Sequence, residues 1–215
     1  MRDFWSQPNH DTSADDVGCR WAILVEGESD RGALEVLARR RGRVLAEEGV
    51  SIVPMGGATN IGHYLDRYGP AGLNLRLAGL CDAAEEAHFR ARLERAGLGA
   101  GPSRGAMAEL GFFVCDRDLE DELIRALGPD AVEGIIEGQG ELPSLRLLQK
   151  QPAQRPRSTH DQLHRFMGSR SQRKEHYARL MVAELDLARM PSALDAVLDF
   201  AASARDETAR RDQLA

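Results

Sequence analysis

The chain has 215 residues, of which 42% are hydrophobic, and its formal net charge is −6 at pH 7. This length and composition suit one domain with a substantial core and exclude a chain that is disordered throughout. The acidic balance is not the bulk signature of a nucleic-acid-binding protein, and no apolar run approaches the roughly 20 residues of a membrane span.

The first eighteen residues are polar and lack the apolar central region of a signal peptide. We therefore expect residues 1–18 to form a flexible extension. The chain has three cysteines, and none belongs to a CxxC motif, which argues against a disulfide framework or a zinc site. Cys81 and Cys115 lie in apolar runs and are predicted to be buried, and the expected compartment is a reducing cytoplasm.

Residues 20–128 alternate four times between a short apolar run and an amphipathic segment. The apolar runs are typical of buried strands and the amphipathic segments of helices, several of which end at a glycine. The expected strands are 21–26, 50–55, 75–82 and 111–116, and the expected helices are 29–42, 60–69, 83–97 and 118–128. This order predicts a mainly parallel four-stranded sheet with helices on both faces and right-handed crossovers.

The rest of the chain has mostly helical patterns. Helices are expected at 130–138, 162–168, 174–190 and 192–202, whereas the proline-containing stretch 141–158 is expected to be a flexible connection. The predicted organisation is an α/β core at 19–140, a C-terminal helical part of the same domain at 141–202, and a tail at 203–215.

Basic residues are concentrated in two places. Eight basic residues but only two acids lie between Lys150 and Arg179, and the segment 39–43 reads RRRGR. This uneven distribution permits a local anion-binding face on an acidic protein. His160 and His164 have the i, i+4 spacing of some metal sites but lack the partner of an HExxH motif, so we expect them to be solvated or to face phosphate.

Carboxylates follow the predicted strands at the edge where function gathers in an open parallel sheet. They directly end two strands or start the next helix, and they are Glu26, Asp30, Asp82, Glu85, Glu86 and Glu120. Acids in a first helical turn also stabilise the helix macrodipole, but this does not account for Glu26, which follows five apolar residues. Converging carboxylates repel one another unless a hard divalent cation binds them.

Three segments in order, LVEGESD, VPMGGATN and GLCDAAEE, resemble the Toprim domain. Its pattern is a glutamate after the first strand, a glycine-bearing loop after the second and Asp-x-Asp after the third. Glu26, Gly56 or Gly57, and Asp82 occupy these places, while Ala84 replaces the second aspartate and Glu85 is the candidate substitute.

The segment FFVCDRDLEDEL, and C-terminal helices that begin near a lysine and carry a proline before the last one, resemble the OLD (overcoming lysogenization defect) family of nucleases. The resemblance covers roughly residues 20–200. Such proteins usually carry an ATPase ahead of the Toprim domain, but this sequence has no G-x-x-x-x-G-K-[ST] motif. The expectation is therefore a stand-alone Toprim protein.

This resemblance implies a divalent-metal-dependent nuclease with two Mg²⁺ or Mn²⁺ ions. The expected substrate is DNA, and RNA stays open as the alternative. Glu26, Asp30 and Glu120 are expected to hold one ion, and Asp82 with Glu85 or Glu86 the other. Glu26 is also the candidate general acid or base, and Lys174 is expected to stabilise charge on the scissile phosphate. The candidate phosphate contacts are Ser29, Gly56, Gly57, Arg170 and Arg173.

Two other interpretations stay open. The chain could be a catalytically weak binding or regulatory module that docks to a separate ATPase or to nucleic acid, which Ala84 and the acidic charge favour. A phosphatase-like or receiver-like domain also gathers acids at strand ends, and would have a phosphorylatable aspartate. A homodimer would suit the cleavage of two strands, although no residue pattern requires one.

Overall fold

Four parallel strands form one sheet in the order β2-β1-β3-β4 in the computed structural model, which describes residues 18–99, 101 and 103–212. The strands are β1 Trp21–Val25, β2 Val50–Pro54, β3 Arg76–Asp82 and β4 Phe112–Cys115. All four lie where the sequence predicts them, so the predicted α/β class with a parallel sheet is confirmed. The predicted extension at 1–18 lies outside the described residues except for Gly18.

The helices between the strands also follow the predicted order. They are α1 Glu28–Arg40, α2 Ile61–Tyr68, α3 Glu86–Arg95 and α5 Leu119–Leu127, with short 3-10 turns at Ala58–Asn60 and Ala83–Glu85. One further helix, α4 Arg104–Glu109, was not predicted. It is only six residues long, and the Ser103 hydroxyl caps it by accepting a hydrogen bond from the Ala106 N–H.

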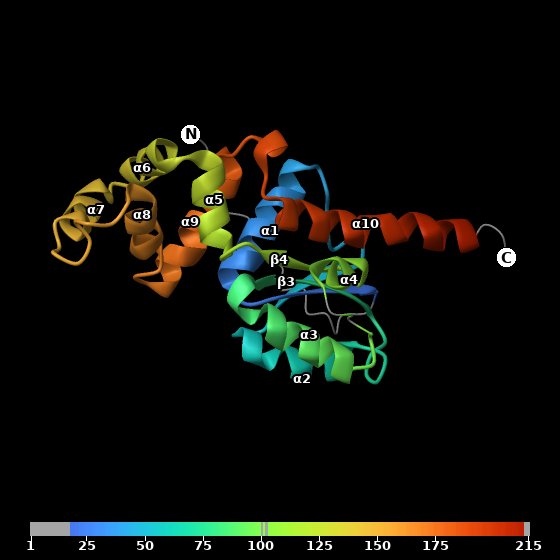
Figure 1. Ribbon diagram of the computed structural model, residues 1–215. Helices are drawn as coiled ribbons and strands as arrows, with labels where there is room; N and C mark the ends of the chain where they lie inside the picture. Colours follow the sequence, from blue (N-terminus) through green and yellow to red (C-terminus); the bar gives the residue numbers. More distant parts are fainter. Residues whose placement is uncertain (1–17, 100, 102, 213–215) are drawn as a thin grey trace.

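Five helices follow α5 and build the C-terminal part. They are α6 Pro129–Gly138, α7 Leu142–Gln149, α8 Thr159–Met167, α9 Ser171–Glu184 and α10 Ser192–Asp212, with a 3-10 turn at Leu187–Arg189. Figure 1 shows α6, α7 and α8 as a lobe on one side of the sheet and α10 as a long helix across the strands. The helix α10 runs through most of the predicted tail at 203–215, and residues 213–215 lie outside the described part.

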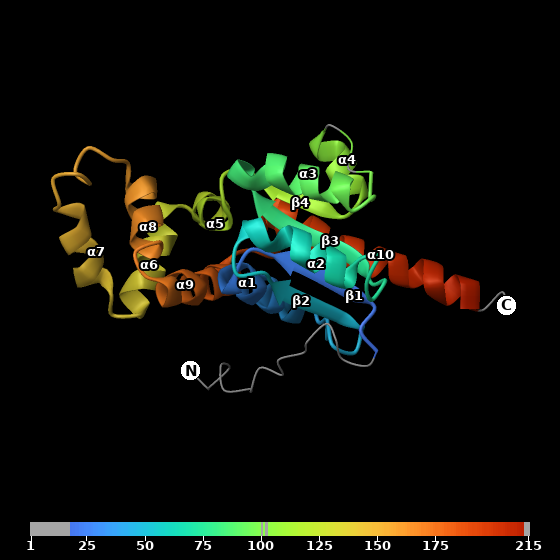
Figure 2. The same ribbon diagram turned by 90° about the horizontal axis from the view of Figure 1, so that it is seen from below.

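The sheet is buried on both faces because its strands are mostly apolar, with Ser51 and the two end residues of β3, Arg76 and Asp82, as exceptions. Along β1, Trp21, Ile23 and Val25 join a core formed with α1, α9 and α10, whereas Ala22 and Leu24 join a second core under α2 and α3. This follows from the two-residue period of a strand, which points successive side chains to opposite faces. Figure 2 shows α2 and α3 on one side of the strands and α1 and α10 on the other.

The prediction of a flexible connection at 141–158 was wrong for its first half, whereas residues 150–158 do connect α7 to α8. Residues 142–149 form α7, and its side chain Leu145 is fully buried. Glu141, just before the helix, accepts hydrogen bonds from the Tyr177 hydroxyl at 2.8 Å and from the Arg173 guanidinium at 2.8 Å. These partners come from α9, more than thirty residues away, so local sequence patterns did not reveal them.

The RRRGR segment does not form an anion-binding surface, because three of its four arginines, Arg40, Arg41 and Arg43, hold the C-terminal helices. Arg40 donates to the carbonyls of Val182 and Leu185 at the end of α9. The guanidinium of Arg41 bonds to Asp195 and Asp199 of α10, and that of Arg43 to Glu48 and to the Leu198 carbonyl. A helix C-terminus leaves carbonyls unpaired, so a basic side chain there stabilises the helix.

Gly79 in the middle of β3 offers a test of sheet packing. A methyl group at this position would meet the Leu24 carbonyl at 2.8 Å and the Phe112 ring at 2.9 Å. We expect Gly79→Ala to lower the free energy of unfolding by about 1–3 kcal/mol. Chemical denaturation measures this, with Gly134→Ala on the open side of α6 as a control that should gain up to about 1 kcal/mol. Equal effects of both changes would contradict the packing described.

Cys81 and Cys115 are buried as predicted. Among the described residues, no helix combines the length and apolar character needed to cross a membrane.

Candidate functional site

Glu26 and Asp82 lie at the point in the sheet where successive crossover connections go to opposite sides of β1. From β1 the chain crosses to β2 on one side and then to β3 on the other side, so the carboxyl ends of β1 and β3 are neighbours. Glu26 directly follows β1, and Asp82 is the last residue of β3. The sequence places acids at the edge where open α/β sheets bind their ligands, and the observed strand order brings these two together.

Asp30 lies in the first turn of α1 and is only 8% exposed. Its Oδ2 accepts a hydrogen bond of 2.9 Å from the Gly27 N–H, which ties the carboxylate to the loop that carries Glu26. Burial, followed by the negative charge of Glu120, raises the pKa of Asp30 to about 7. A carboxylate held in this state would gain from a nearby cation.

Glu120 of α5 and Lys174 of α9 form an ion pair next to Asp30. The Lys174 Nζ lies 3.1 Å from Glu120 Oε2, and the glutamate side chain is 3% exposed. Burial raises the pKa of Glu120, and the charge and hydrogen bond of Lys174 oppose this change. The pKa of Lys174 is raised above its ordinary value, because Glu120, Asp30 and Asp82 outweigh the effect of its burial.

Asp82 completes this group. Burial is the largest cause that raises its pKa to about 8, and the charges of Asp30 and Glu26 add to it. The residues Glu26, Asp30, Asp82 and Glu120, which we call the acid cluster, therefore influence one another across the ends of β1 and β3 and the starts of α1 and α5. Lys174 is the cation that faces them from the C-terminal helices.

The acid cluster has the ligand chemistry for a hard divalent cation. All its donors are carboxylate oxygens, and Glu120 Oε1 is buried with no hydrogen-bond partner in the part of the chain that the structure describes. As the side chains stand, however, no group of three or more His, Cys, Asp or Glu among the described residues is arranged to hold a metal ion. The donors fit an ion, and their side chains would have to turn toward it.

Two predicted metal ligands stand apart from this cluster. The two oxygens of Glu86 bond to Arg90 at 3.0 Å and to Arg104 at 2.7 Å, so both are occupied by guanidinium groups. Glu85 ends the 3-10 turn after β3, where it adds to the charges around the Cys81 thiol. The structure thus brings four of the six predicted ligands together and leaves Glu85 and Glu86 at the rim.

The candidate phosphate contacts divide in the same way. Gly56 and Gly57 have φ values of 69° and 123°, which favour glycine, and the Gly57 N–H donates to the Glu26 carbonyl at 3.0 Å. Ser29 is buried at the start of α1. The Arg173 guanidinium lies 4.0 Å from the centre of the Phe166 ring and bonds to Glu141, so its role is in packing. Arg170 is exposed beside it.

Two histidine–aspartate pairs at this edge were missed from the sequence. His160 Nε2 lies 2.8 Å from Asp121 Oδ1, and His164 Nε2 lies 2.7 Å from Asp118 Oδ2. The expectation that the histidines are solvated or face phosphate was wrong, because the acids come from α5, which packs on α8. The signal was a matched spacing, with acids three residues apart on one helix and histidines four apart on the other.

The second of these pairs lies close to the acid cluster. Although burial raises the pKa of Asp118, the His164 hydrogen bond and the Asp121 N–H hold it below its ordinary value. The Asp118 bond raises the pKa of His164. Asp118 also caps α5 by accepting the Asp121 N–H at 2.8 Å, so this pair fixes the helix start that presents Glu120.

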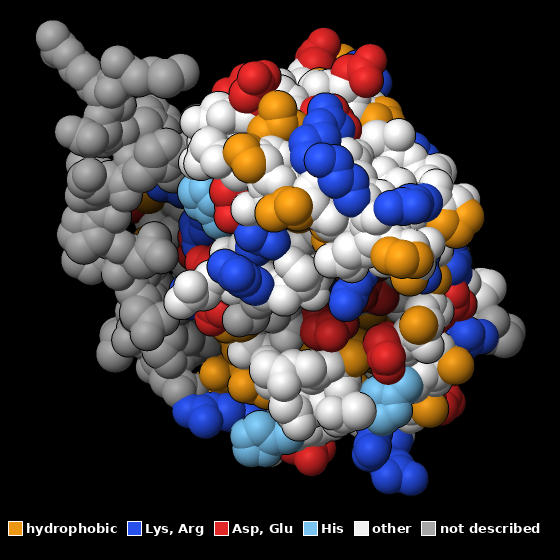
Figure 3. All heavy atoms as spheres, turned by 90° about the vertical axis from the view of Figure 1, so that its left-hand side faces the viewer, with side chains coloured by type: hydrophobic (Ala, Val, Ile, Leu, Met, Phe, Trp, Pro, Cys, Tyr) orange, Lys and Arg blue, Asp and Glu red, His pale blue; other side chains and the backbone are white. Residues whose placement is uncertain are grey.

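The basic residues of the C-terminal part do not form one continuous surface. Figure 3 looks onto this side of the molecule and shows Lys and Arg side chains interspersed with Asp and Glu. Several are paired, as Arg146 is with Glu133 and Arg179 with Glu35. The excess of positive charge along the sequence is therefore divided in space by acids from other segments.

The raised pKa values predict how stability depends on pH without metal. Asp30 and Asp82 keep their protons to about pH 7 and about pH 8 in the folded state, but lose them near 3.8 when unfolded. The folded state thus binds more protons over this range, and the free energy of unfolding should fall as pH rises from about 5 to about 8. Denaturant titrations in chelator would show this, and Asp30→Asn should flatten the slope. A slope unchanged in Asp30→Asn would contradict the assignment.

Comparison with known proteins agrees with this architecture. The fold and the edge of acids define an α/β domain of Toprim type. Residues 19–83 match the family model described as "Overcoming lysogenization defect protein-like, TOPRIM domain". No curated protein sequence matches the chain.

Solved structures extend the likeness to most of the chain. The C-terminal region of the Xanthomonas campestris pv. campestris OLD protein is 22% identical with a TM-score of 0.72, over 90% of this chain and 97% of that chain. The C-terminal region of the Burkholderia pseudomallei OLD protein is 23% identical with a TM-score of 0.65, over 87% and 98% of the two chains. Residues 19–83 thus resemble an OLD-like Toprim domain and most of the chain shares the fold of the OLD C-terminal regions, so the predicted resemblance is confirmed.

Proposed function

We propose that the protein is a divalent-metal-dependent nuclease that hydrolyses phosphodiester bonds of DNA at the acid cluster. The observation that carries this proposal is the convergence of Glu26, Asp30, Asp82 and Glu120 on one sheet edge opposite Lys174. Mutually repelling carboxylates in a partly buried place cost stability, so such a group is most readily explained by a cation that binds them.

Bound Mg²⁺ or Mn²⁺ would act as a Lewis acid toward the phosphate oxygens. Glu26, Asp30 and Glu120 are the candidate ligands of one ion and Asp82 of a second, with Glu85 the nearest further donor. Glu26 would also accept the proton of the attacking water, because it is the acid that no helix start accounts for. Lys174 would stabilise the charge that develops on the scissile phosphate.

The ion pair with Glu120 links the proposed role of Lys174 to metal binding. Its ammonium now neutralises Glu120, which is the ligand with an unpaired buried oxygen. An ion that takes over Glu120 would free Lys174 to bind phosphate. The same side chain would thereby respond to both metal and substrate.

The test is cleavage of supercoiled plasmid DNA by the purified protein with Mg²⁺ or Mn²⁺. We expect nicked or linear product with either ion and none in chelator. Calorimetric titration with Mn²⁺ provides an independent measurement of metal binding. Absence of product together with absence of metal binding at millimolar concentrations would refute the proposal.

A second candidate function is a binding or regulatory module with weak catalysis, which would dock to a separate ATPase or to nucleic acid. Two observations favour it: Ala84 replaces the second aspartate, and arginines occupy both oxygens of Glu86. The same calorimetric titration separates the two candidates, because the module requires no metal.

A further inference from the structure

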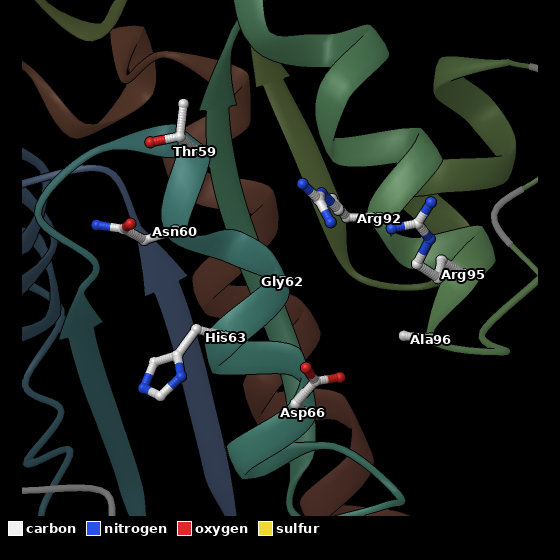
Figure 4. Close-up of a pocket in the computed structure, with 8 residues that line it drawn as sticks. All are labelled: Thr59, Asn60, Gly62, His63, Asp66, Arg92, Arg95 and Ala96. Carbon is white, nitrogen blue, oxygen red and sulfur yellow. The ribbon is translucent and has the colours of Figure 1, made fainter.

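A groove between α2 and α3 lies on the sheet face that α10 does not cover. Its volume is about 320 Å³, and it is lined by Asn60 just before α2, by Gly62 and Asp66 of α2, and by Arg92 and Arg95 of α3. Figure 4 shows both arginines extending from α3, with Arg92 pointing toward α2. None of the residues assigned to the acid cluster lies in this groove.

The two arginines of the groove lack a carboxylate partner. Many other guanidinium groups bind acids, as those of Arg41, Arg43 and Arg104 do. Within the described ranges, the side chains of Arg92 and Arg95 form no ion pair or hydrogen bond. Asp66 lines the groove and is paired with neither of them. Arg92 is half-buried, and its Cδ would lie 3.5 Å from a methyl group built on Gly62. A guanidinium in such a place favours a planar or tetrahedral oxyanion, above all phosphate.

The groove begins next to the acid cluster. The Gly57 N–H donates to the Glu26 carbonyl at 3.0 Å, and the Asn60 N–H donates to the Gly57 carbonyl at 3.1 Å. One short loop therefore separates Glu26 from the near end of the groove. From Asn60 to Asp66 the chain rises roughly 9 Å at about 1.5 Å per residue, which is longer than a single phosphate needs.

We propose that the α2–α3 groove binds the phosphate groups of the DNA strand that flanks the bond cleaved at the acid cluster. Arg92 and Arg95 contact the phosphates, and the contacts are independent of base sequence because they reach only the backbone. The identity of the ligand rests on the proposed function. The groove itself rests on its position and on its two unpaired cations.

The test measures DNA binding without cleavage. The protein carries Glu26→Gln, and binding to a labelled DNA duplex is followed by fluorescence anisotropy at several salt concentrations. We expect Arg92→Gln with Arg95→Gln to weaken binding at least tenfold at low salt. The slope of log K against log salt should become less steep by about 0.9 for each phosphate contact removed.

The matched control is Arg20→Gln with Arg39→Gln, which removes the same charge at the start of β1 and the end of α1, away from the groove. Thermal unfolding confirms that both double variants are folded. Equal affinity and equal salt slope in the two double variants would overturn the proposal, as would the absence of DNA binding. If inorganic phosphate bound to the protein through these two arginines while their loss left DNA binding unaffected, the groove would be a small-anion site. That result would also overturn the proposal.

Plasmid cleavage by the same arginine variants with Glu26 intact separates the groove from the nuclease activity. Arginine-dependent binding by a protein that never cleaves DNA would keep the groove and remove the catalytic proposal. DNA binding and cleavage that are both unaffected by loss of the two arginines would keep the catalytic proposal and remove the groove.

Discussion

Glu26→Gln and Asp82→Asn are each expected to lower the rate of metal-dependent plasmid cleavage by at least about 100-fold. Glu26 is the candidate proton acceptor, and such groups contribute about 10²–10⁴-fold to a rate. Asp82 ends the neighbouring strand, and burial and nearby acids raise its pKa to about 8. Both changes replace a carboxylate by an amide of the same shape, so the effect reports charge and proton transfer rather than packing.

The control for this prediction is Glu28→Gln. Glu28 lies two residues after Glu26, but its side chain is 49% exposed and pairs with Arg31 at 2.8 Å. We expect the cleavage activity of the Glu28→Gln variant to stay within about threefold of that of the original protein, since exposed ion pairs contribute little to stability. Equal residual cleavage by the original protein, Glu26→Gln and Asp82→Asn would contradict the acid cluster as the catalytic site.

Lys174→Met is expected to destabilise the metal-free protein and to remove most of its cleavage activity. Glu120 would lose its charged hydrogen-bond partner in a buried place, which costs about 1.5–3 kcal/mol. Part of this cost is relieved because Glu120 can take up a proton. Denaturant titration measures the loss, and added Mn²⁺ should reduce it if the ion takes the place of the ammonium.

A double variant sharpens this second prediction. Adding Glu120→Gln to Lys174→Met removes the buried charge, so most of the lost stability should return. The chain has only one other lysine, Lys150, which is exposed after α7, and Lys150→Met is the matched control. If Lys150→Met destabilised the protein as much as Lys174→Met, the pair with Glu120 would not be the cause.

The two histidine–aspartate pairs help to hold the lobe of α6, α7 and α8 in a fixed position relative to the sheet. They join α8 to the start of α5, and α5 in turn presents Glu120 to Lys174 on α9. The acid cluster thus depends on helices from both halves of the chain. A shift of α5 would move Glu120 away from Asp30, with which it interacts electrostatically.

Much of the candidate site could be predicted because each acid has a local signature. Glu26 and Asp82 end apolar runs, and Asp30 and Glu120 lie in the first turn of the helix that follows a strand. Parallel strands place their carboxyl ends at one edge, so their convergence followed from the strand pattern. The same argument could not separate Glu86 from the cluster, because its second arginine partner, Arg104, belongs to a helix without a clear sequence pattern.

The sequence by itself determined the parallel sheet, the order of its elements and the edge at which acids gather, since these depend on periodicity and on neighbouring residues. The tertiary structure decided the partners of the charges. It paired Arg41 with α10, Glu141 with α9 and His164 with α5, and it left Arg92 and Arg95 facing a groove. The physical reason is that a charge interacts with whatever lies within a few ångströms, and contacts between distant segments leave no local pattern in the sequence.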